Sequence, residues 1–385
     1  MNKRIYLDYN ATTPLSDEVK KIFFAELELY ANASSLHEDG RLELKKIEQA
    51  RRECADLIGC TAPEILFTSG GSESNNMVFQ TMKKVSLKNG RKTIVISAIE
   101  HPCVIESAKQ LEKEGFKIIK VPVDEYGIVR IEAYRQALEE NPLFVSIMSA
   151  NNEIGTIQDI KTLCSMAHEK GALFHTDAVQ AAGKITVDMK DWDADYATFS
   201  AHKIYGPKGI GALFVKKGTP IEPLIRGGHQ EKGLRAGTYN APSIAAFGHA
   251  CLCAQKELVS YADKTRKLRE KLRDGLIEKI PNIRINGHPE RVLPNTLDVS
   301  FPGAEGEAIL LHLDLLGISV STGSACASGS LEPSHVLVAT GLGPELAHGS
   351  IRFSFGKYNS ESDVEYILHN FPPVIERLRK MSTLS

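Results

Sequence analysis

The sequence predicts an α/β protein with a mainly parallel sheet of seven strands, because strand-like and helical segments alternate through much of the chain. Seven short apolar runs are typical of strands; they cover residues 65–68, 93–97, 117–121, 143–149, 172–175, 196–200 and 211–215. Helical patterns lie between most of these runs, as at residues 104–113, 131–139 and 160–169. This alternation favours parallel strands with helices on both faces of the sheet.

Length and composition restrict the class of protein. A chain of 385 residues is long for a single core, which predicts two domains. A net charge of −2 with 24% charged residues does not suggest nucleic acid or a membrane surface as a partner. Because residues 1–13 lack the apolar core of a signal peptide and no run approaches a membrane span, we expect a soluble, cytoplasmic protein.

The seven cysteines include no CxxC pair, which argues against a disulfide framework or a structural zinc site. We therefore predict no metal site.

The chain begins with a short predicted strand at residues 5–7 and a polar loop at residues 8–14. A helix with Ser16 as its N-cap follows, and then a charged amphipathic helix over about residues 41–58.

A long helical pattern over about residues 243–280, broken near Tyr261, is expected to lead into a second, smaller α+β domain. The predicted division assigns residues 14–255 to the large domain, and residues 1–13 and 256–385 to the small one. The elements expected in the small domain are strands at 295–300 and 317–321, a helix at 305–315 and a closing helix from Ser362.

Polar residues follow several of the predicted strands. The small-residue turn at 69–76 opens a helix, where free N–H groups attract phosphate. Glu100-His101, Asn151-Asn152-Glu153, Asp177 and Ser200-Ala201-His202-Lys203 follow other strands. Each group alone is a common loop or cap, but ligands of parallel sheets bind outside the carboxyl ends of the strands. Together these groups indicate a cofactor site. The sequence contains neither the GxGxxG pattern typical of dinucleotide binding nor the P-loop pattern typical of nucleoside triphosphate binding, so neither ligand is predicted.

Lys203 lies between two predicted strands, after a histidine and before a Gly-Pro-x-Gly turn. A buried lysine loses its charge by desolvation, and the neutral amine can form a Schiff base with an aldehyde. Taken alone, Lys203 is more typical of a surface lysine beside a tight turn. The other groups at the sheet edge favour the chemical interpretation.

Two further residues stand out in the C-terminal part. Cys326 lies within a run of small residues, 321–330, which we expect to be mobile and to expose a reactive thiol. The alternative is that Cys326 is a small buried hydrophobic residue. Arg352 alternates with apolar residues on a predicted strand, where it either clamps a carboxylate or pairs with a structural acid.

The motifs of the whole chain resemble those of the class V, fold-type I pyridoxal-phosphate enzymes, and within them the NifS/IscS-type cysteine desulfurases. Eight motifs carry the resemblance, in this order: Asp8-x-x-Ala-Thr-Thr-Pro, Thr68-Ser-Gly-x-x-Glu-Ser-x-Asn, Glu100-His101, Asn151-Asn152-Glu153-x-Gly155, His175-x-Asp177-Ala178-x-Gln180, Ser200-Ala-His-Lys203, Arg235-x-Gly-Thr238 and Gly323-Ser-Ala-Cys326. The resemblance implies a fold-type I enzyme whose small domain carries a catalytic-cysteine loop at about residues 321–333.

The resemblance also implies roles around the cofactor ring. Lys203 would bind pyridoxal 5'-phosphate as a Schiff base and later move the Cα proton of the substrate. Asp177 would pair with the pyridine nitrogen and keep it protonated. His101 would stack on the ring and act as acid and base on the substrate thiol. Gln180 and Asn152 would hydrogen-bond the ring hydroxyl, with Asn152 also meeting the substrate.

The resemblance places the phosphate and the substrate as well. Thr238 would reach the phosphate from the other subunit, which requires a homodimer, and Arg352 would bind the α-carboxylate of L-cysteine. The Cys326 thiolate would attack the substrate sulfur, leaving a persulfide on Cys326 and releasing alanine. The sulfur would pass to an iron–sulfur scaffold, where Cys326 would touch a metal cluster only transiently, or to another acceptor protein. The remaining phosphate contacts would be Gly71, Ser72, Ser200 and His202.

Other functions share part of this pattern. A selenocysteine lyase, an aminotransferase or a kynureninase-like enzyme would also need Lys203 and Asp177, but an aminotransferase does not need Cys326 on a loop. A non-catalytic relative would have lost at least one of Lys203, Asp177, His101 and Cys326, and all four are present. The sequence therefore favours a desulfurase.

Overall fold

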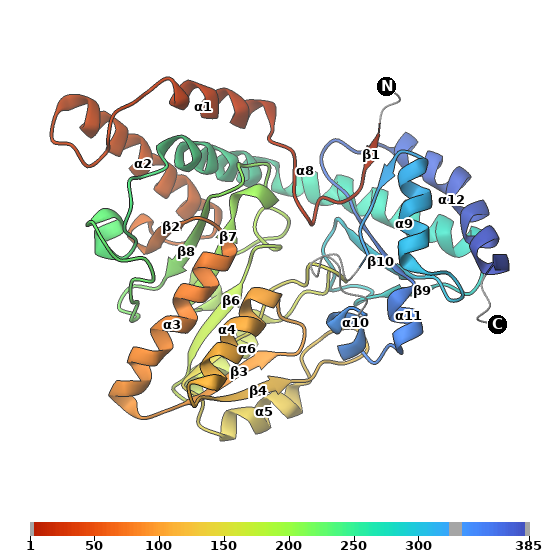
Figure 1. Cartoon of the computed structure of the whole chain (residues 1–385), viewed down its shortest axis with the longest axis horizontal. Coiled ribbons are helices and arrows are strands. Elements are labelled where there is room, and N and C mark those ends of the chain that lie inside the picture. The colour runs from red at the N-terminus through yellow and green to blue at the C-terminus, as the bar shows by residue number, and fades with distance from the viewer. Residues whose placement is uncertain (1–3, 323–332, 382–385) are drawn as a thin grey trace.

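A computed structural model describes residues 4–322 and 333–381 of the chain. Seven strands form one sheet in the order β2-β8-β7-β6-β5-β3-β4 (Figure 1). The strands from β3 to β7 pair in parallel, while β8 lies antiparallel between β2 and β7. The bounds are β2 Ile65–Thr68, β3 Thr93–Ser97, β4 Lys117–Val121, β5 Phe144–Ser146, β6 Leu173–Asp177, β7 Tyr196–Ser200 and β8 Gly211–Val215.

This sheet confirms the predicted α/β fold, with two differences at strand ends. β5 is shorter than the expected strand at residues 143–149, although the Ser149 N–H still donates to the Asp177 carbonyl at 3.0 Å. β6 extends through Asp177 instead of ending at His175. The extension places the Asp177 side chain on the last residue of a strand rather than in a loop.

Helices cover both faces of the sheet because alternate strand residues enter different cores. Ile65 and Phe67 pack in a core with α2 and α8, whereas Leu66 packs on the opposite face with α3 and α4. Phe174 lies on the same face of the sheet as Ile65 and Phe67, and there it packs against α5 and α6. The bounds are α1 Asp17–Leu27, α2 Glu38–Leu57, α3 Gly71–Asn89, α4 Pro102–Lys113, α5 Ile131–Glu139, α6 Ile160–Glu169, α7 Met189–Trp192 and α8 Ala241–Lys279.

The C-terminal part has its own small sheets and its own core. β12, β10 and β9 form an antiparallel sheet in that order, and β1 pairs in parallel with β11, so the N-terminal strand packs here. Helices α9 and α12 pack on this core. The bounds are β1 Ile5–Tyr6, β9 Arg284–Asn286, β10 Thr296–Ser300, β11 Ile318–Ser319, β12 Ser350–Ser354, α9 Gly306–Leu315, α10 His335–Ala339, α11 Pro344–His348 and α12 Glu361–Met381.

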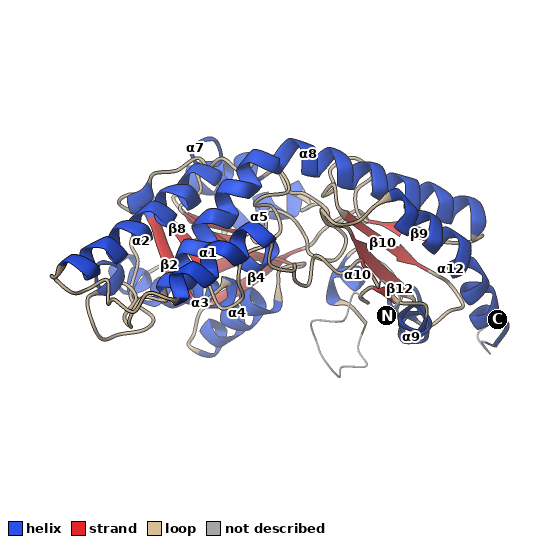
Figure 2. Ribbon diagram, turned by 90° about the horizontal axis from the view of Figure 1, so that it is seen from above, coloured by secondary structure: helices blue, strands red, loops and turns tan. Residues whose placement is uncertain are grey.

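Helix α8 is continuous, so the predicted break near Tyr261 is wrong. Tertiary contacts hold the helix through this point: the Tyr261 ring packs edge-on against Tyr205 at 6.3 Å, and its hydroxyl donates to the Phe355 carbonyl at 3.3 Å. Figure 2 shows α8 running along both the large and the small sheet. The division at residues 255/256 thus falls inside one helix and stays a prediction. Within the described residues, no helix combines the length and the apolar character needed to cross a membrane.

Candidate active site

Lys203 lies directly after β7, in a single 3₁₀ turn over Ala201–Lys203. Its side chain is half-buried, and its amine donates to the main-chain carbonyls of Asn10 at 2.5 Å and Ala11 at 2.7 Å. The turn is closed by Tyr205, whose φ of 65° is in the left-handed region. The amine is therefore held at the sheet edge by the N-terminal segment, a contact between residues almost 200 positions apart in sequence.

Asp177 ends β6 and is 5% exposed. Its carboxylate accepts hydrogen bonds from the Asn75 side-chain amide at 2.8 Å and from the Val179 N–H at 3.0 Å. Both donors are neutral, and among the described residues Asp177 forms no ion pair. A buried carboxylate with only neutral donors retains a strong attraction for a bound cation.

His101 is the N-cap of α4 and is half-buried. Its Nδ1 accepts from the Cys103 N–H at 3.3 Å and lies 2.9 Å from the Cys103 sulfur. Burial lowers the pKa of His101, and the Asp177 carboxylate only partly opposes this shift. The ring is therefore neutral at physiological pH, and in the tautomer that directs an Nδ1 proton at the Cys103 sulfur its Nε2 is able to take up a proton.

The first turn of α3 lies beside the ends of β6 and β7. A Cβ added to Gly71 would meet Val179 Cγ2 at 3.1 Å and Thr198 Cγ2 at 3.5 Å. The preceding Gly70 has φ 154° and ψ −178°, a conformation open essentially to glycine alone. The start of this helix thus places free N–H groups at the same edge as Asp177 and Ser200, which suits an anion.

The other residues expected around a phosphate have different surroundings. Ser200 is buried at the end of β7, whereas Ser72 and Thr238 are exposed. The Nδ1 of His202 lies 3.2 Å from the Thr12 hydroxyl, and burial lowers the pKa of His202 to about 4. His202 is therefore neutral at physiological pH and can bind an anion only as a hydrogen-bond donor.

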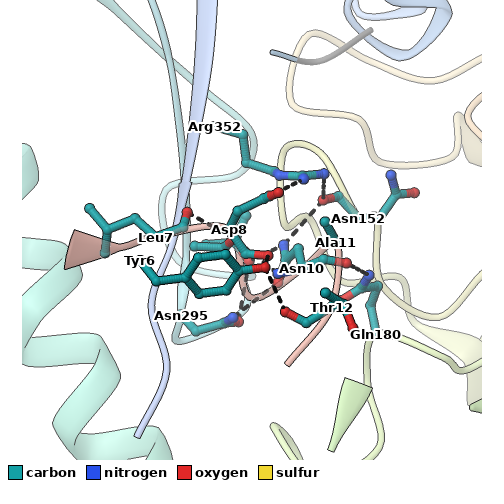
Figure 3. Close-up of polar contacts among 12 residues, drawn as sticks. Tyr6, Leu7, Asp8, Asn10, Ala11, Thr12, Asn152, Gln180, Asn295 and Arg352 are labelled. Carbon is teal, nitrogen blue, oxygen red and sulfur yellow. Dashed lines mark hydrogen bonds and ion pairs between the residues drawn. The ribbon is translucent and has the colours of Figure 1, made fainter. Parts of the chain in front are cut away.

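Arg352 is buried on β12 (Figure 3). The sequence allowed it two roles, to bind the carboxylate of a ligand or to pair with a structural acid. One terminal nitrogen pairs with the Asp8 carboxylate at 2.7 Å, and the other donates to the Asn152 carbonyl at 3.0 Å. Its Nε is buried and has no partner among the described residues. The guanidinium therefore pairs with a structural acid and still keeps one donor for a further acceptor.

Asn10 forms hydrogen bonds with three of the predicted site residues, Lys203, Gln180 and Asn152 (Figure 3). Its carbonyl accepts from Lys203 and from the Gln180 side-chain amide, the latter at 3.0 Å. Its own side-chain amide donates to the Asn152 carbonyl at 3.1 Å and to the Thr296 hydroxyl at 2.8 Å. The sequence predicted only a polar loop here, and no periodicity or spacing marks Asn10 as a hub.

Lys184 is a second residue of the site that no sequence pattern marks. It is 1% exposed, and its amine donates to the side-chain oxygens of Gln180 and Asn10. Burial lowers its pKa well below the ordinary lysine value, and the nearby cations Lys203 and Arg352 add to the shift. Nothing in the run of small residues before Lys184 indicates a buried amine.

Two contacts join the start of α10 to the sheet edge. Ser334 donates to the Glu153 carboxylate, and the His335 Nε2 lies 3.0 Å from the Glu100 carbonyl. Both acids are buried, and burial raises the pKa of each to about 8. Cys326 and most of the predicted loop at 321–333 lie outside the described residues.

Known proteins match this chain over almost its whole length. The aminotransferase class-V family matches residues 5–367. The chain belongs to this family. It is also 46% identical over 383 residues to a protein named cysteine desulfurase IscS from Dictyoglomus turgidum, covering 99% of this chain and 97% of that protein.

Two further comparisons cover this class-V chain almost completely. A protein named cysteine desulfurase IscS from Clostridium botulinum is 44% identical over 389 residues, which span 100% of this chain and 97% of the relative. A solved structure described as a NifS-like protein superimposes with a TM-score of 0.91 at 40% identity, covering 97% of this chain and 100% of that one. These matches confirm the family that the motifs indicated.

Class-V enzymes of this kind depend on pyridoxal phosphate, and the described residues fit that cofactor by the chemistry of their donors. Lys203 offers an amine for the aldehyde, and Asp177 offers a buried carboxylate held by neutral groups. The glycine-led start of α3 offers N–H groups for the phosphate. One edge of the sheet thus carries a partner for each reactive part of the cofactor.

Proposed function

We propose that this protein is a cysteine desulfurase that removes sulfur from L-cysteine and releases L-alanine. The observation that carries the proposal is the meeting of Lys203, Asp177 and His101 at one sheet edge, in a chain similar over its full length to proteins named cysteine desulfurase. Bound pyridoxal phosphate supplies an electron sink for the pair left when the Cα proton departs.

The cofactor would be held by groups on several elements. Lys203 would bind its aldehyde carbon, and Asp177 would keep its pyridine nitrogen protonated. Gln180 and Asn152 would bind the ring hydroxyl. The remaining cofactor contacts would come from Gly71, Ser72, Ser200 and His202 around the phosphate, and from Thr238 of the other subunit of a homodimer.

The substrate would be oriented by charge and by neutral donors. Arg352 would bind the α-carboxylate. Its Nε, which has no partner within residues 4–322 and 333–381, supports this role although Asp8 already occupies one terminal nitrogen. Asn152 would contact the same end of the substrate. His101 is neutral because burial lowers its pKa, so it can take the proton of the substrate thiol. Lys203, released as an amine, would remove the Cα proton and return a proton to the product.

Cys326 would accept the sulfur. Its thiolate attacks the substrate sulfur, a sulfur–sulfur bond forms as the carbon–sulfur bond breaks, and the departing carbon is protonated to give alanine. The persulfide on Cys326 would then pass to an iron–sulfur scaffold or another acceptor protein. This chemistry suits a soluble, cytoplasmic enzyme.

The test is turnover of cysteine with dithiothreitol, with alanine and sulfide assayed together in wild type and Cys326→Ser. Equal amounts of alanine and sulfide from wild type, both lost in the variant, would support a persulfide-forming desulfurase. Alanine without sulfide, or undiminished turnover by the variant, would contradict it. Selenocysteine turned over in place of cysteine would instead support the lyase alternative.

A further inference from the structure

Three side chains with different metal-binding atoms meet where α1 crosses α8. They are Glu18 on α1, and His249 and Cys253 on α8. His249 and Cys253 are four residues apart, so both side chains lie on one face of the helix. The Cys253 thiol donates to the Glu18 carboxylate at 3.2 Å, and one ligand atom from each residue lies within 4.8 Å of the other two.

The three donors form a chemically coherent set. A thiolate, an imidazole and a carboxylate are the three protein ligand types that bind Zn²⁺. In a tetrahedral zinc site the ligand atoms stand roughly 3.5 Å apart, given bonds of about 2.0–2.3 Å. The Cys253 sulfur and the Glu18 carboxylate are already 3.2 Å apart, and the exposed Glu18 side chain has room to adjust.

We propose that Glu18, His249 and Cys253 form a binding site for a divalent cation of the Zn²⁺ class, with water at the fourth position. The thiolate and the carboxylate would balance the two charges of the ion. Binding at neutral pH would displace the thiol proton to solvent, because the thiolate is the form of cysteine that binds a metal ion. The affinity should therefore increase with pH.

The residues beside the proposed cation site indicate what a bound ion would do to the fold. Glu257, one turn after Cys253, is paired at 3.5 Å with Lys357, so these two charges largely cancel beside the site. Cys253 also lines a hollow that Lys203 and Tyr261 share. A bound ion would join α1 to α8, and α1 directly follows the loop whose carbonyls hold Lys203. Binding should thus stabilise the N-terminal segment against this hollow.

The expectation of no metal site rested on the absence of CxxC pairs. A site built from an i,i+4 pair on one helix and a single residue more than 200 positions earlier leaves no such spacing in the sequence.

The first experiment is a Co²⁺ titration of the cofactor-loaded enzyme in a Cys326→Ser background, which removes a competing thiol. A phosphine reductant replaces dithiothreitol, which would itself bind the metal. Difference spectra should show a thiolate-to-cobalt charge-transfer band and intense tetrahedral bands that saturate at one equivalent per chain. Zn²⁺ should displace the cobalt and abolish both features.

Three variants decide the assignment. Cys253→Ser should abolish the charge-transfer band, and Glu18→Gln, a milder change at an exposed position, should weaken Zn²⁺ binding by at least about tenfold in a chelator competition. Cys60→Ser is the matched control, because among the described residues this half-buried thiol has only the Thr61 carbonyl as a hydrogen-bond partner, and it should leave binding unchanged. Absence of a saturable band, or a band that survives in Cys253→Ser, would overturn the proposal.

Discussion

Glu153 is a buried acid whose protonation is set by its surroundings. It is 4% exposed, and the Ser334 hydroxyl donates to its carboxylate. Burial raises the pKa of Glu153 to about 8, outweighing both this hydrogen bond and the attraction of Arg352. The folded protein therefore binds a proton here that the unfolded chain releases near pH 4.5. The resulting stabilisation is fully present below that pH and is lost as the pH rises through about 8.

We expect Glu153→Gln to flatten the pH dependence of stability between about pH 5 and pH 8, because glutamine copies the protonated acid without titrating. Wild type should lose up to roughly 4 kcal/mol more than the variant across this interval. Glu100 titrates in the same direction and remains, so the slope should fall without vanishing. Urea unfolding at several pH values measures the slope, with exposed Glu132→Gln as the control. An unchanged slope would contradict the buried, protonated state.

His101 is the residue whose environment best suits proton transfer. Because burial lowers its pKa, the ring stays neutral at lower pH than a free imidazole. We expect His101→Ala to slow alanine formation by roughly 10²–10⁴-fold, and the acid limb of the wild-type pH–rate profile to lie below the ordinary histidine pKa of about 6.5. Exposed His369→Ala is the control. A loss below about threefold would reduce His101 to a stacking role.

At the scale of elements, two glycines of α8 allow neighbouring helices to approach it closely, α2 at Gly248 and α12 at Gly275. A Cβ on Gly248 would meet the Ala50 Cα of α2 at 2.4 Å, a contact with backbone that cannot move alone. A Cβ on Gly275 would meet only the side chain of Leu368, at 2.4 Å. The first glycine therefore sets the distance between two helices, whereas the second leaves a flexible side chain to adjust.

The two glycines make a matched pair for mutation. Gly248→Ala should destabilise the protein by about 1–3 kcal/mol, because α2 must shift away from α8. Gly275→Ala should change stability by less than about 1 kcal/mol, because the gain in helix propensity offsets the displacement of Leu368. Urea unfolding of both variants checks the contrast. Equal losses would show that the α2–α8 approach is not the tighter constraint.

At the scale of the whole molecule, the N-terminal segment joins the two parts of the chain. β1 adds to the C-terminal part through β11, and Asn10 follows within a few residues. The Asn10 side chain bonds Thr296 and Asn295 of the C-terminal part, and also Lys184 and Asn152 of the large-sheet part. The same residue thereby fixes the carbonyl that holds Lys203.

We expect Asn10→Ala to lower the free energy of unfolding by roughly 2–4 kcal/mol, because it leaves buried partners such as Lys184 and Asn152 with fewer hydrogen bonds. It should also weaken pyridoxal-phosphate binding, measured by fluorescence titration of the cofactor-free protein, because the carbonyl beside Lys203 loses its support. The control Asn370→Ala, which removes one hydrogen bond within α12 from a half-buried side chain, should stay within about 0.5 kcal/mol of wild type. Similar effects in both variants would contradict the joining role of Asn10.

The sequence by itself determined the alternation of strands and helices, the position of Lys203 directly after a strand, and the family. These features depend on local periodicity and on motifs that are contiguous in the chain. Only the tertiary structure decided that α8 passes Tyr261 unbroken, that Asn10 and the buried Lys184 connect the polar groups, and that Glu18 meets Cys253. Each of these depends on contacts between residues distant in sequence, where packing and desolvation outweigh the local preference of the chain.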